Sequence, residues 1–167
     1  MEHGGGCDAE SVEPGAGDAD LVSLVARATP AGTGEHVVTV PVACGYCGSD
    51  GVDEFQVWAG DCYCVGCLLA IGVWDGGDPQ TLPLKTAAFP WRLVASTAPL
   101  PSTSPSDYFR CSTGTMLFHV AVAVVLGQDD VVRRISVGLK CSEHGGRYLY
   151  IDNARVEPAE PCRAVSG

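Results

Sequence analysis

Basic residues are nearly absent from the first half of the chain. Residues 1–90 contain 13 Asp and Glu but only Arg27 and Lys85, whereas residues 91–167 carry 7 acids and 8 bases. Proteins bind nucleic acid mainly by neutralising phosphates with Lys and Arg. The charge distribution therefore disfavours a nucleic-acid partner and favours a protein partner with a basic surface.

The N-terminus lacks the features of a secretory signal, and the chain lacks a long hydrophobic run. Residues 1–20 contain no Lys or Arg and no apolar segment. The longest apolar run, Met116–Leu126, contains His119 and has about half of the ~20 residues that a membrane-spanning helix needs. We expect an intracellular protein, in the cytoplasm or nucleus, without membrane contact. The nine cysteines are then metal ligands or free thiols rather than disulfides.

Common catalytic motifs and internal repeats are also missing. The sequence has no phosphate-binding loop, no Gly-x-Ser-x-Gly elbow and no dinucleotide-binding fingerprint. It has no repeat of fixed period and no sustained heptad. Nothing in these motifs favours an enzyme over a binding protein.

The apolar pattern predicts a mainly β fold with little helix and an antiparallel sheet. Hydrophobic residues make up 46% of the chain, which is enough for a core, and 21 Gly and 11 Pro indicate many turns. A short helix is expected over residues 20–28. The strands are expected over residues 36–42, 52–59, 91–95, 115–126, 131–140 and 147–151.

The chain is long enough for one domain of ordinary size. Residues 1–20 are Gly-rich and acidic and predict a disordered tail. Residues 36–160 are expected to form a single zinc-stabilised β-rich domain, with a proline-rich connection at about 75–107. In the last third, the polar segment 127–130 between two β-branched runs predicts a hairpin.

Two Cys-x₂-Cys pairs separated by sixteen residues form the strongest motif in the sequence. Two cysteines three apart can both point into one tight turn, and two such turns supply four sulfurs for a tetrahedral zinc ion. Each pair encloses a glycine, Gly45 or Gly66, which suits such a turn because a backbone without a Cβ can take a positive φ. The predicted ligands of this zinc site are Cys44, Cys47, Cys64 and Cys67.

Over residues 44–67 this arrangement resembles zinc ribbons and treble clefs. The resemblance implies two zinc knuckles, and the strand expected over 52–59 has the length that such a hairpin requires. Cys62 is too close to Cys64 for a usual knuckle. It is either a spare cysteine or a ligand of a second site.

A second zinc site is predicted from hairpin geometry. If the 127–130 turn pairs Leu126 with Val131, antiparallel register places Met116 opposite Cys141. The predicted ligands at this end of the hairpin are Cys111, Cys141 and His144. The fourth ligand is left open between Cys162, Cys62 and water. The alternative is a buried Cys111 with an exposed His144.

These features favour a non-enzymatic, zinc-binding protein-interaction module, such as a regulatory or viral accessory protein. Two alternatives remain. A zinc-dependent hydrolase would use an open site at the second cluster, with Glu143 as the base. A RING-like ubiquitin-ligase adaptor would also use two zinc sites. Exposed aromatic residues would anchor a partner, and Tyr148 and Tyr150, which share one face of the last strand, are candidates.

Overall fold

The computed structural model contains one helix and eight strands among the residues it describes. These residues are 16–44, 47, 53–58, 61–68, 70–71, 91–94 and 108–158. The elements are α1 (Ala16–Ala28), β1 (His36–Pro41), β2 (Phe55–Trp58), β3 (Asp61–Cys64), β4 (Ala70–Ile71), β5 (Trp91–Leu93), β6 (Phe118–Leu126), β7 (Val132–Cys141) and β8 (Arg147–Pro158).

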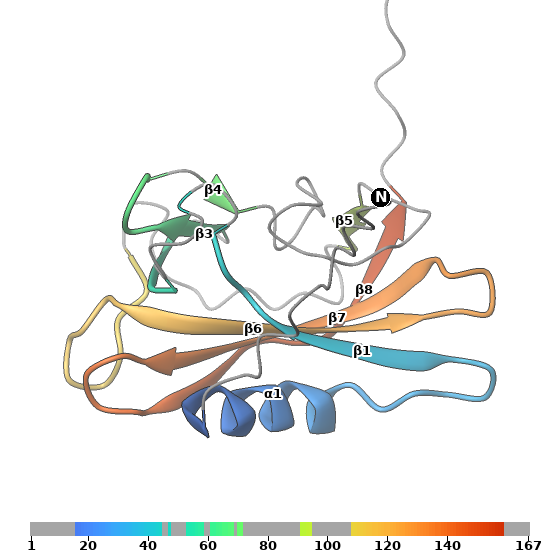
Figure 1. Ribbon diagram of the computed structural model, residues 1–167. Helices are drawn as coiled ribbons and strands as arrows, with labels where there is room; N and C mark the ends of the chain where they lie inside the picture. The colour runs from blue at the N-terminus through green and yellow to red at the C-terminus, as the bar shows by residue number, and fades with distance from the viewer. Residues whose placement is uncertain are drawn as a thin grey trace, which may run out of the picture.

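The strands form an antiparallel sheet in the order β4-β3-β2-β6-β7-β8-β5, and β1 also pairs with β6. Figure 1 shows the long strands β6, β7 and β8 side by side, with the short strands β3 and β4 set apart from them. The prediction of a mainly β, antiparallel fold is confirmed. The expected strands over 36–42, 52–59, 91–95 and the last third are all present, although β3 was not expected.

One edge of β6 is shared by two strands in succession. β1 pairs with its second half, from His36 opposite Leu126 to Pro41 opposite Ala121. β2 then meets the first residue of β6, where Phe55 lies opposite Phe118. Because β2 takes over this edge at Phe118, the chain must leave β6 after Val42, whose N–H still donates to Val120 O at 2.8 Å.

The helix α1 lies along one face of this sheet (Figure 1). Its apolar residues Leu21 and Val25 are buried against Ala121 and Ala123 of β6. Small sheet residues allow this approach, most of all Gly138 of β7, where an added Cβ would lie 2.7 Å from Cγ1 of Val25. The helix begins at Ala16, four residues before the expected start, so it includes part of the predicted tail.

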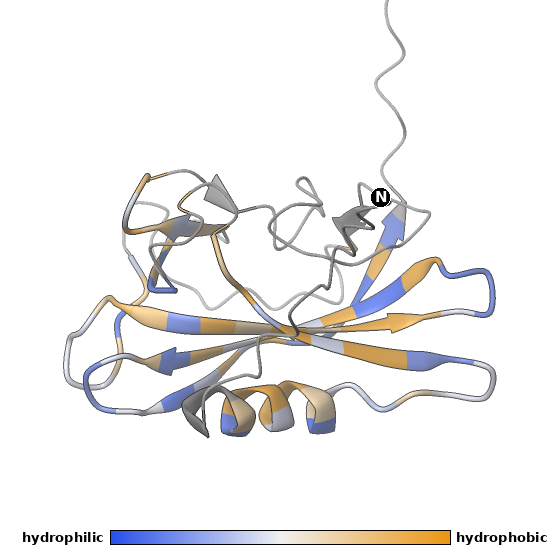
Figure 2. Ribbon diagram, viewed as in Figure 1, coloured by the Kyte–Doolittle hydropathy of each residue, from blue (hydrophilic) through white to orange (hydrophobic). Residues whose placement is uncertain are grey.

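The larger core lies on the opposite face of β6 and β7. Every second side chain of β6 points into it, starting at Phe118, and the facing side chains of β7 do the same. Figure 2 shows the apolar residues concentrated along these two strands. The largest fully buried members are Phe55, Phe118, Ile135, Leu139, Val57 and Val122.

The register of the β6–β7 hairpin differs from the predicted one. Phe118, and not Met116, lies opposite Cys141. The displacement of two residues has two sources: Leu126 pairs with Val132 instead of Val131 at the turn, and a β-bulge between Val125 and Leu126 adds one more residue. A bulge adds an unpaired residue to one strand, so a register counted from the turn is displaced along the whole hairpin.

Tyr148 and Tyr150 of β8 do not form an exposed patch. Tyr150 is buried, and both rings stand edge-on to the Phe109 ring at centroid distances of 5.5 and 5.4 Å. The Tyr148 hydroxyl accepts a hydrogen bond from Ser112 N at 3.0 Å. These tyrosines therefore belong to the core around Phe109, which also contacts Phe118.

Other sequence predictions lie wholly or partly outside the described residues. These include residues 1–15 of the expected tail and most of the proline-rich connection, of which the structure describes 91–94. Within the described part of the chain, no helix has the length and apolar character needed to cross a membrane.

Candidate metal centre

The four cysteines of the first predicted site come together where β1 ends and β3 ends. Cys44 lies two residues after Val42, whose N–H still donates to Val120 O of β6 at 2.8 Å. Cys64 is the last residue of β3 and lies opposite Phe55, which in turn pairs with β6. Both Cys-x₂-Cys segments are thus attached to the same edge of β6, although the sequence separates them by sixteen residues.

The geometry of the four sulfurs fits a tetrahedral metal ion. All four Sγ atoms lie within 4.8 Å of one another. Cys44 Sγ lies 3.6 Å from Cys67 Sγ, and Cys47 Sγ lies 3.5 Å from Cys64 Sγ, so each contact joins the two segments. A disulfide would require about 2.05 Å. Sulfurs that each lie about 2.3 Å from one zinc ion are about 3.8 Å apart, close to the observed spacing.

Burial and backbone donors shape the ionisation of these thiols. Burial alone would raise the pKa of Cys64, but the backbone N–H groups of Cys67 and Gly66 and the Cys47 thiol stabilise its thiolate and lower the pKa to about 7. The pKa of Cys47 is raised to about 12, chiefly because its thiol donates to Cys64 and because it is desolvated. One thiolate therefore forms readily, and it suppresses the ionisation of its neighbour.

These opposite pKa shifts of Cys47 and Cys64 are expected where several cysteine sulfurs lie close enough to share one cation. Without a metal, negative charge cannot accumulate on four close sulfurs, so one thiol keeps its proton. A divalent cation would remove that restriction, because coordinating thiols lose their protons. The residues present can hold a metal ion through four sulfur ligands, the donor set typical of structural zinc and iron–sulfur sites.

The second segment closes as a tight turn after β3. Leu68 N donates to Cys64 O at 2.8 Å, so the chain reverses around the two cysteines. The positive φ in this turn falls on Leu68, at 59°, and not on Gly66. Gly45 lies outside the described residues.

Cys62 does not join the metal cluster. Its exposed fraction is 0%, and it lies opposite Val57 of β2 within the larger core. Cys62 and Cys64 are two residues apart on one strand and so point to the same face. The difference is that Cys64 ends the strand at the turn, where Cys67 returns to meet the first segment.

Among the described residues, the predicted ligands of the second site do not form a group whose ligand atoms converge. Cys141 is buried, while His144 is exposed. Glu143, the base of the hydrolase alternative, accepts a hydrogen bond from Thr115 Oγ1 at 2.9 Å. A second zinc at Cys111, Cys141 and His144 stays a prediction, and Cys162 lies outside the described residues.

Cys111 has a different set of partners. Its Sγ lies 2.9 Å from Thr113 Oγ1 and accepts a hydrogen bond from Thr115 N at 3.3 Å. The Thr113 hydroxyl contributes most to lowering the pKa of Cys111, to about 6, with the backbone N–H groups of Thr113 and Thr115 adding to it against the effect of burial. The thiolate is thus stabilised by local donors.

The sequence pattern did not predict a group of aromatic rings around Trp58. Trp58 lies between Tyr63 and Tyr108, with ring centroids 6.0 and 6.2 Å away. The alternation in β2 contained the information, because Phe55 and Val57 are buried and leave Trp58 on the outer side. The position of Tyr108 could not be read from that pattern, since it comes from a segment fifty residues later.

Comparisons with known proteins give no relative. No protein-family model matches the chain, and neither a curated protein nor a solved structure is significantly similar to it.

Proposed function

We propose that this protein is a zinc-stabilised module that binds a basic segment of another protein and has no catalytic activity of its own. The observation that carries the proposal is the convergence of four cysteine sulfurs within 4.8 Å. Zinc is the metal that most often occupies closed Cys₄ sites in proteins. With four protein ligands the coordination is complete, whereas a catalytic zinc keeps one position for water or substrate.

The zinc would serve stability rather than chemistry. Its ligands lie on two segments, one after β1 and one from the end of β3. Both strands reach the edge of β6, β1 directly and β3 through β2. Of the four sulfurs, those of Cys44 and Cys64 are the buried pair. A metal ion there would hold the end of β1 against the end of β3, and the free energy of metal binding would add to that of folding.

An aromatic surface around Trp58 of β2 supports the binding role. We call Trp58, Tyr63 and Tyr108 the aromatic patch. Trp58 and Tyr108 are 36% and 40% exposed, and Tyr63 directly precedes the ligand Cys64. Tryptophan and tyrosine dominate the energetics of protein interfaces, because they bury a large area at a small cost in side-chain entropy.

The charge of the chain indicates the chemistry of the partner. The net charge is −10, and residues 1–90 account for an excess of 11 acids over bases. A partner with Lys or Arg would be attracted by this field and could place its cations over the faces of the aromatic patch. The proposed partner is therefore an extended, arginine- or lysine-bearing protein segment.

The metal part of the proposal is tested by elemental mass spectrometry on the purified protein. We expect zinc bound by the wild type to be lost in Cys64→Ser and kept in Cys62→Ala, which changes the neighbouring buried cysteine that is not a ligand. If the wild type holds no metal, or if both variants lose it equally, the Cys₄ assignment is wrong.

The binding part is tested by calorimetry with a synthetic peptide that alternates arginine and glycine. We expect Trp58→Ala to weaken binding by about tenfold, while Leu149→Ala should not, since Leu149 is equally exposed at 36% but lies on β8. Equal binding of a peptide that alternates glutamate and glycine, or equal loss in both variants, would contradict the proposal.

A further inference from the structure

The four sulfurs of the metal cluster can pair in three ways when they are oxidised to disulfides. One way joins the two cysteines within each Cys-x₂-Cys segment, and the other two ways join the segments. The observed contacts favour one of the latter. Cys44 Sγ lies 3.6 Å from Cys67 Sγ, and Cys47 Sγ lies 3.5 Å from Cys64 Sγ. These contacts share no residue, so both bonds can form in the same molecule.

Burial decides which sulfur a small oxidant reaches first. Cys47 and Cys67 are half-buried, whereas Cys44 and Cys64 are buried. Each of the two contacts therefore joins an accessible sulfur to a buried one. The accessible sulfur can react with an oxidant from solvent, and the buried partner can then attack the product. Pairing Cys44 with Cys64 would instead require a bond between the two sulfurs that an oxidant reaches least.

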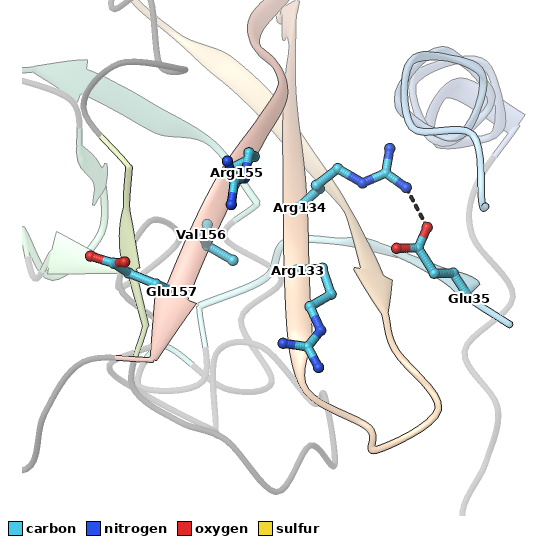
Figure 3. Close-up of a pocket in the computed structure, with 6 residues that line it drawn as sticks. All are labelled: Glu35, Arg133, Arg134, Arg155, Val156 and Glu157. Carbon is cyan, nitrogen blue, oxygen red and sulfur yellow. Dashed lines mark hydrogen bonds and ion pairs between the residues drawn. The ribbon is translucent and has the colours of Figure 1, made fainter. Parts of the chain in front are cut away.

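The oxidant has to reach the cluster directly, without first binding in the pocket at the other end of the sheet. Figure 3 shows this pocket of about 330 Å³, where Arg134 at the start of β7 is paired with Glu35. Arg134 lies opposite Val125, near the end of β6, whereas the cluster adjoins Phe118, the first residue of β6, through Phe55. These two positions are about 23 Å apart along β6. A molecule held in the pocket therefore does not contact the sulfurs.

Charge favours a neutral oxidant. A zinc ion bound by four thiolates has an excess of two negative charges. The net charge of the chain, −10, adds to this field and repels anionic oxidants. Hydrogen peroxide and small alkyl hydroperoxides are uncharged and small enough to reach a half-buried sulfur.

We propose that the metal cluster is a site of oxidation by a hydroperoxide, which converts it into the disulfides Cys44–Cys67 and Cys47–Cys64 and releases the zinc ion. This inference rests on the proposed zinc site. It adds to that site a reaction with a stated class of reactant and a stated pairing of the sulfurs.

The reaction balances with hydrogen peroxide as the oxidant. The thiolate of Cys47 or Cys67 attacks one peroxide oxygen, the O–O bond breaks, and hydroxide leaves, so a sulfenic acid forms. The thiolate of the buried partner attacks that sulfur, forms the S–S bond and displaces a second hydroxide. Each disulfide consumes one peroxide, and two electrons pass from sulfur to oxygen. The zinc ion leaves because the thiolate, and not the disulfide, is the metal ligand.

The two disulfides would hold the same segments together as the metal does. Each joins the segment after β1 to the segment at the end of β3. They link residues 23 and 17 positions apart, and a bond across such a loop restricts the unfolded chain more than a bond within a Cys-x₂-Cys pair. The oxidised protein is therefore expected to stay folded without zinc. Disulfides within each segment would leave the segments unconnected.

The test treats the full-length, zinc-loaded protein with hydrogen peroxide. A chromophoric chelator measures the released zinc, and mass spectrometry of a denatured, non-reduced digest identifies the disulfides. Cleavage after Tyr46 and after Val65 separates the cysteines of each segment, so the three pairings give different masses. We expect complete loss of zinc, the Cys44–Cys67 and Cys47–Cys64 links, and a far-ultraviolet circular dichroism spectrum like that of the zinc-loaded protein.

Cys67→Ser tests the pairing in a second way. It should abolish the link to Cys44 and keep the Cys47–Cys64 link, and the digest is read on metal-free protein as well, in case the variant binds no zinc. The matched controls are Cys62→Ala and Cys111→Ala, which remove buried thiols outside the cluster and should leave zinc release and both links unchanged.

The proposal is overturned if the disulfides form within each segment, if zinc stays bound after the peroxide is consumed, or if either control variant abolishes zinc release. A wild type that binds no metal would contradict the proposed function instead. The digest of the oxidised metal-free protein would still decide the pairing, so the two failures are distinguishable.

Discussion

Identical thiol groups behave differently in this protein because their nearest donors differ. The pKa of Cys47 is raised to about 12 where its thiol donates a hydrogen bond to Cys64, and that of Cys64 is lowered to about 7 where backbone N–H groups point at the sulfur. Cys111 reaches about 6 through a threonine hydroxyl and local N–H groups. At the residue scale, the environment within a few ångströms decides the chemistry.

The backbone of Leu68 is a second residue-scale feature. Its φ of 59° lies in the left-handed region, which costs a side chain with a Cβ about 1–2 kcal/mol. The side chain is 72% exposed, so little packing is lost with it. We expect Leu68→Gly to raise the free energy of unfolding by up to about 1 kcal/mol, measured by urea denaturation of the metal-loaded protein.

Val65→Gly is the matched control for Leu68, because Val65 is an exposed apolar residue of the same turn without a positive φ. Glycine at position 65 adds only the entropic cost of a more flexible backbone. We therefore expect the free energy of unfolding to decrease by about 0.5–1 kcal/mol. A decrease for Leu68→Gly of the same size would show that the turn does not store strain.

At the scale of elements, the contact of α1 with the sheet depends on the small residues beneath it. Leu21 and Val25 are almost completely buried, and Ala121 and Ala123 of β6 and Gly138 of β7 lie close to them. A larger residue at any of these positions would lift the helix from the sheet. The helix itself is short, and most of its stability must come from this packing.

Gly138→Ala tests this contact. An added Cβ would meet Cγ1 of Val25 at 2.7 Å and Cδ1 of Leu21 at 3.0 Å. Overpacking of this kind typically costs about 1–3 kcal/mol. We expect that loss of unfolding free energy in urea denaturation, and we expect the substitution Val25→Ala in the same chain to recover part of it.

The control for Gly138 is Gly146→Ala, where an added Cβ would come no closer than 3.4 Å to the Tyr148 hydroxyl. This variant should stay within about 0.5 kcal/mol of the wild type. If the two glycine variants are equally stable, the packing of α1 on the sheet does not depend on the absence of a Cβ at Gly138.

For the whole molecule, stability is expected to depend on metal and therefore on pH. The folded-state pKa of Cys64, about 7, lies below the ordinary thiol value of 9.0. The associated stabilisation is present at high pH and is lost as the pH falls through about 7 and the thiolate is protonated. A bound metal ion would likewise favour the thiolate form of all four cysteines, because protons compete with the ion for sulfur.

We therefore expect the dissociation constant for zinc to rise steeply when the pH is lowered from about 8 to about 5. Competition with a chromophoric chelator measures this constant, and the protons released on zinc binding can be titrated in the same sample. Cys111→Ala should leave the pH profile unchanged, since Cys111 lies outside the Cys₄ group. A profile without pH dependence would exclude thiolate ligands.

The sequence by itself determined the features that depend on neighbouring residues. Two cysteines three apart in a turn predict a knuckle, and runs of β-branched residues predict strands, because these geometries are set within a few bonds. Cys44, Cys47, Cys64 and Cys67 were identified in this way, and so were most strands of the antiparallel fold.

Only the tertiary structure decided which distant residues meet. The pairing of Leu126 with Val132 and the bulge after Val125 together displaced Cys141 from its expected partner, and packing on Phe109 turned Tyr148 and Tyr150 into core residues. The aromatic patch likewise joins segments far apart in the chain. Such contacts depend on strand order and register, which follow from the free energy of the whole core rather than from any local pattern.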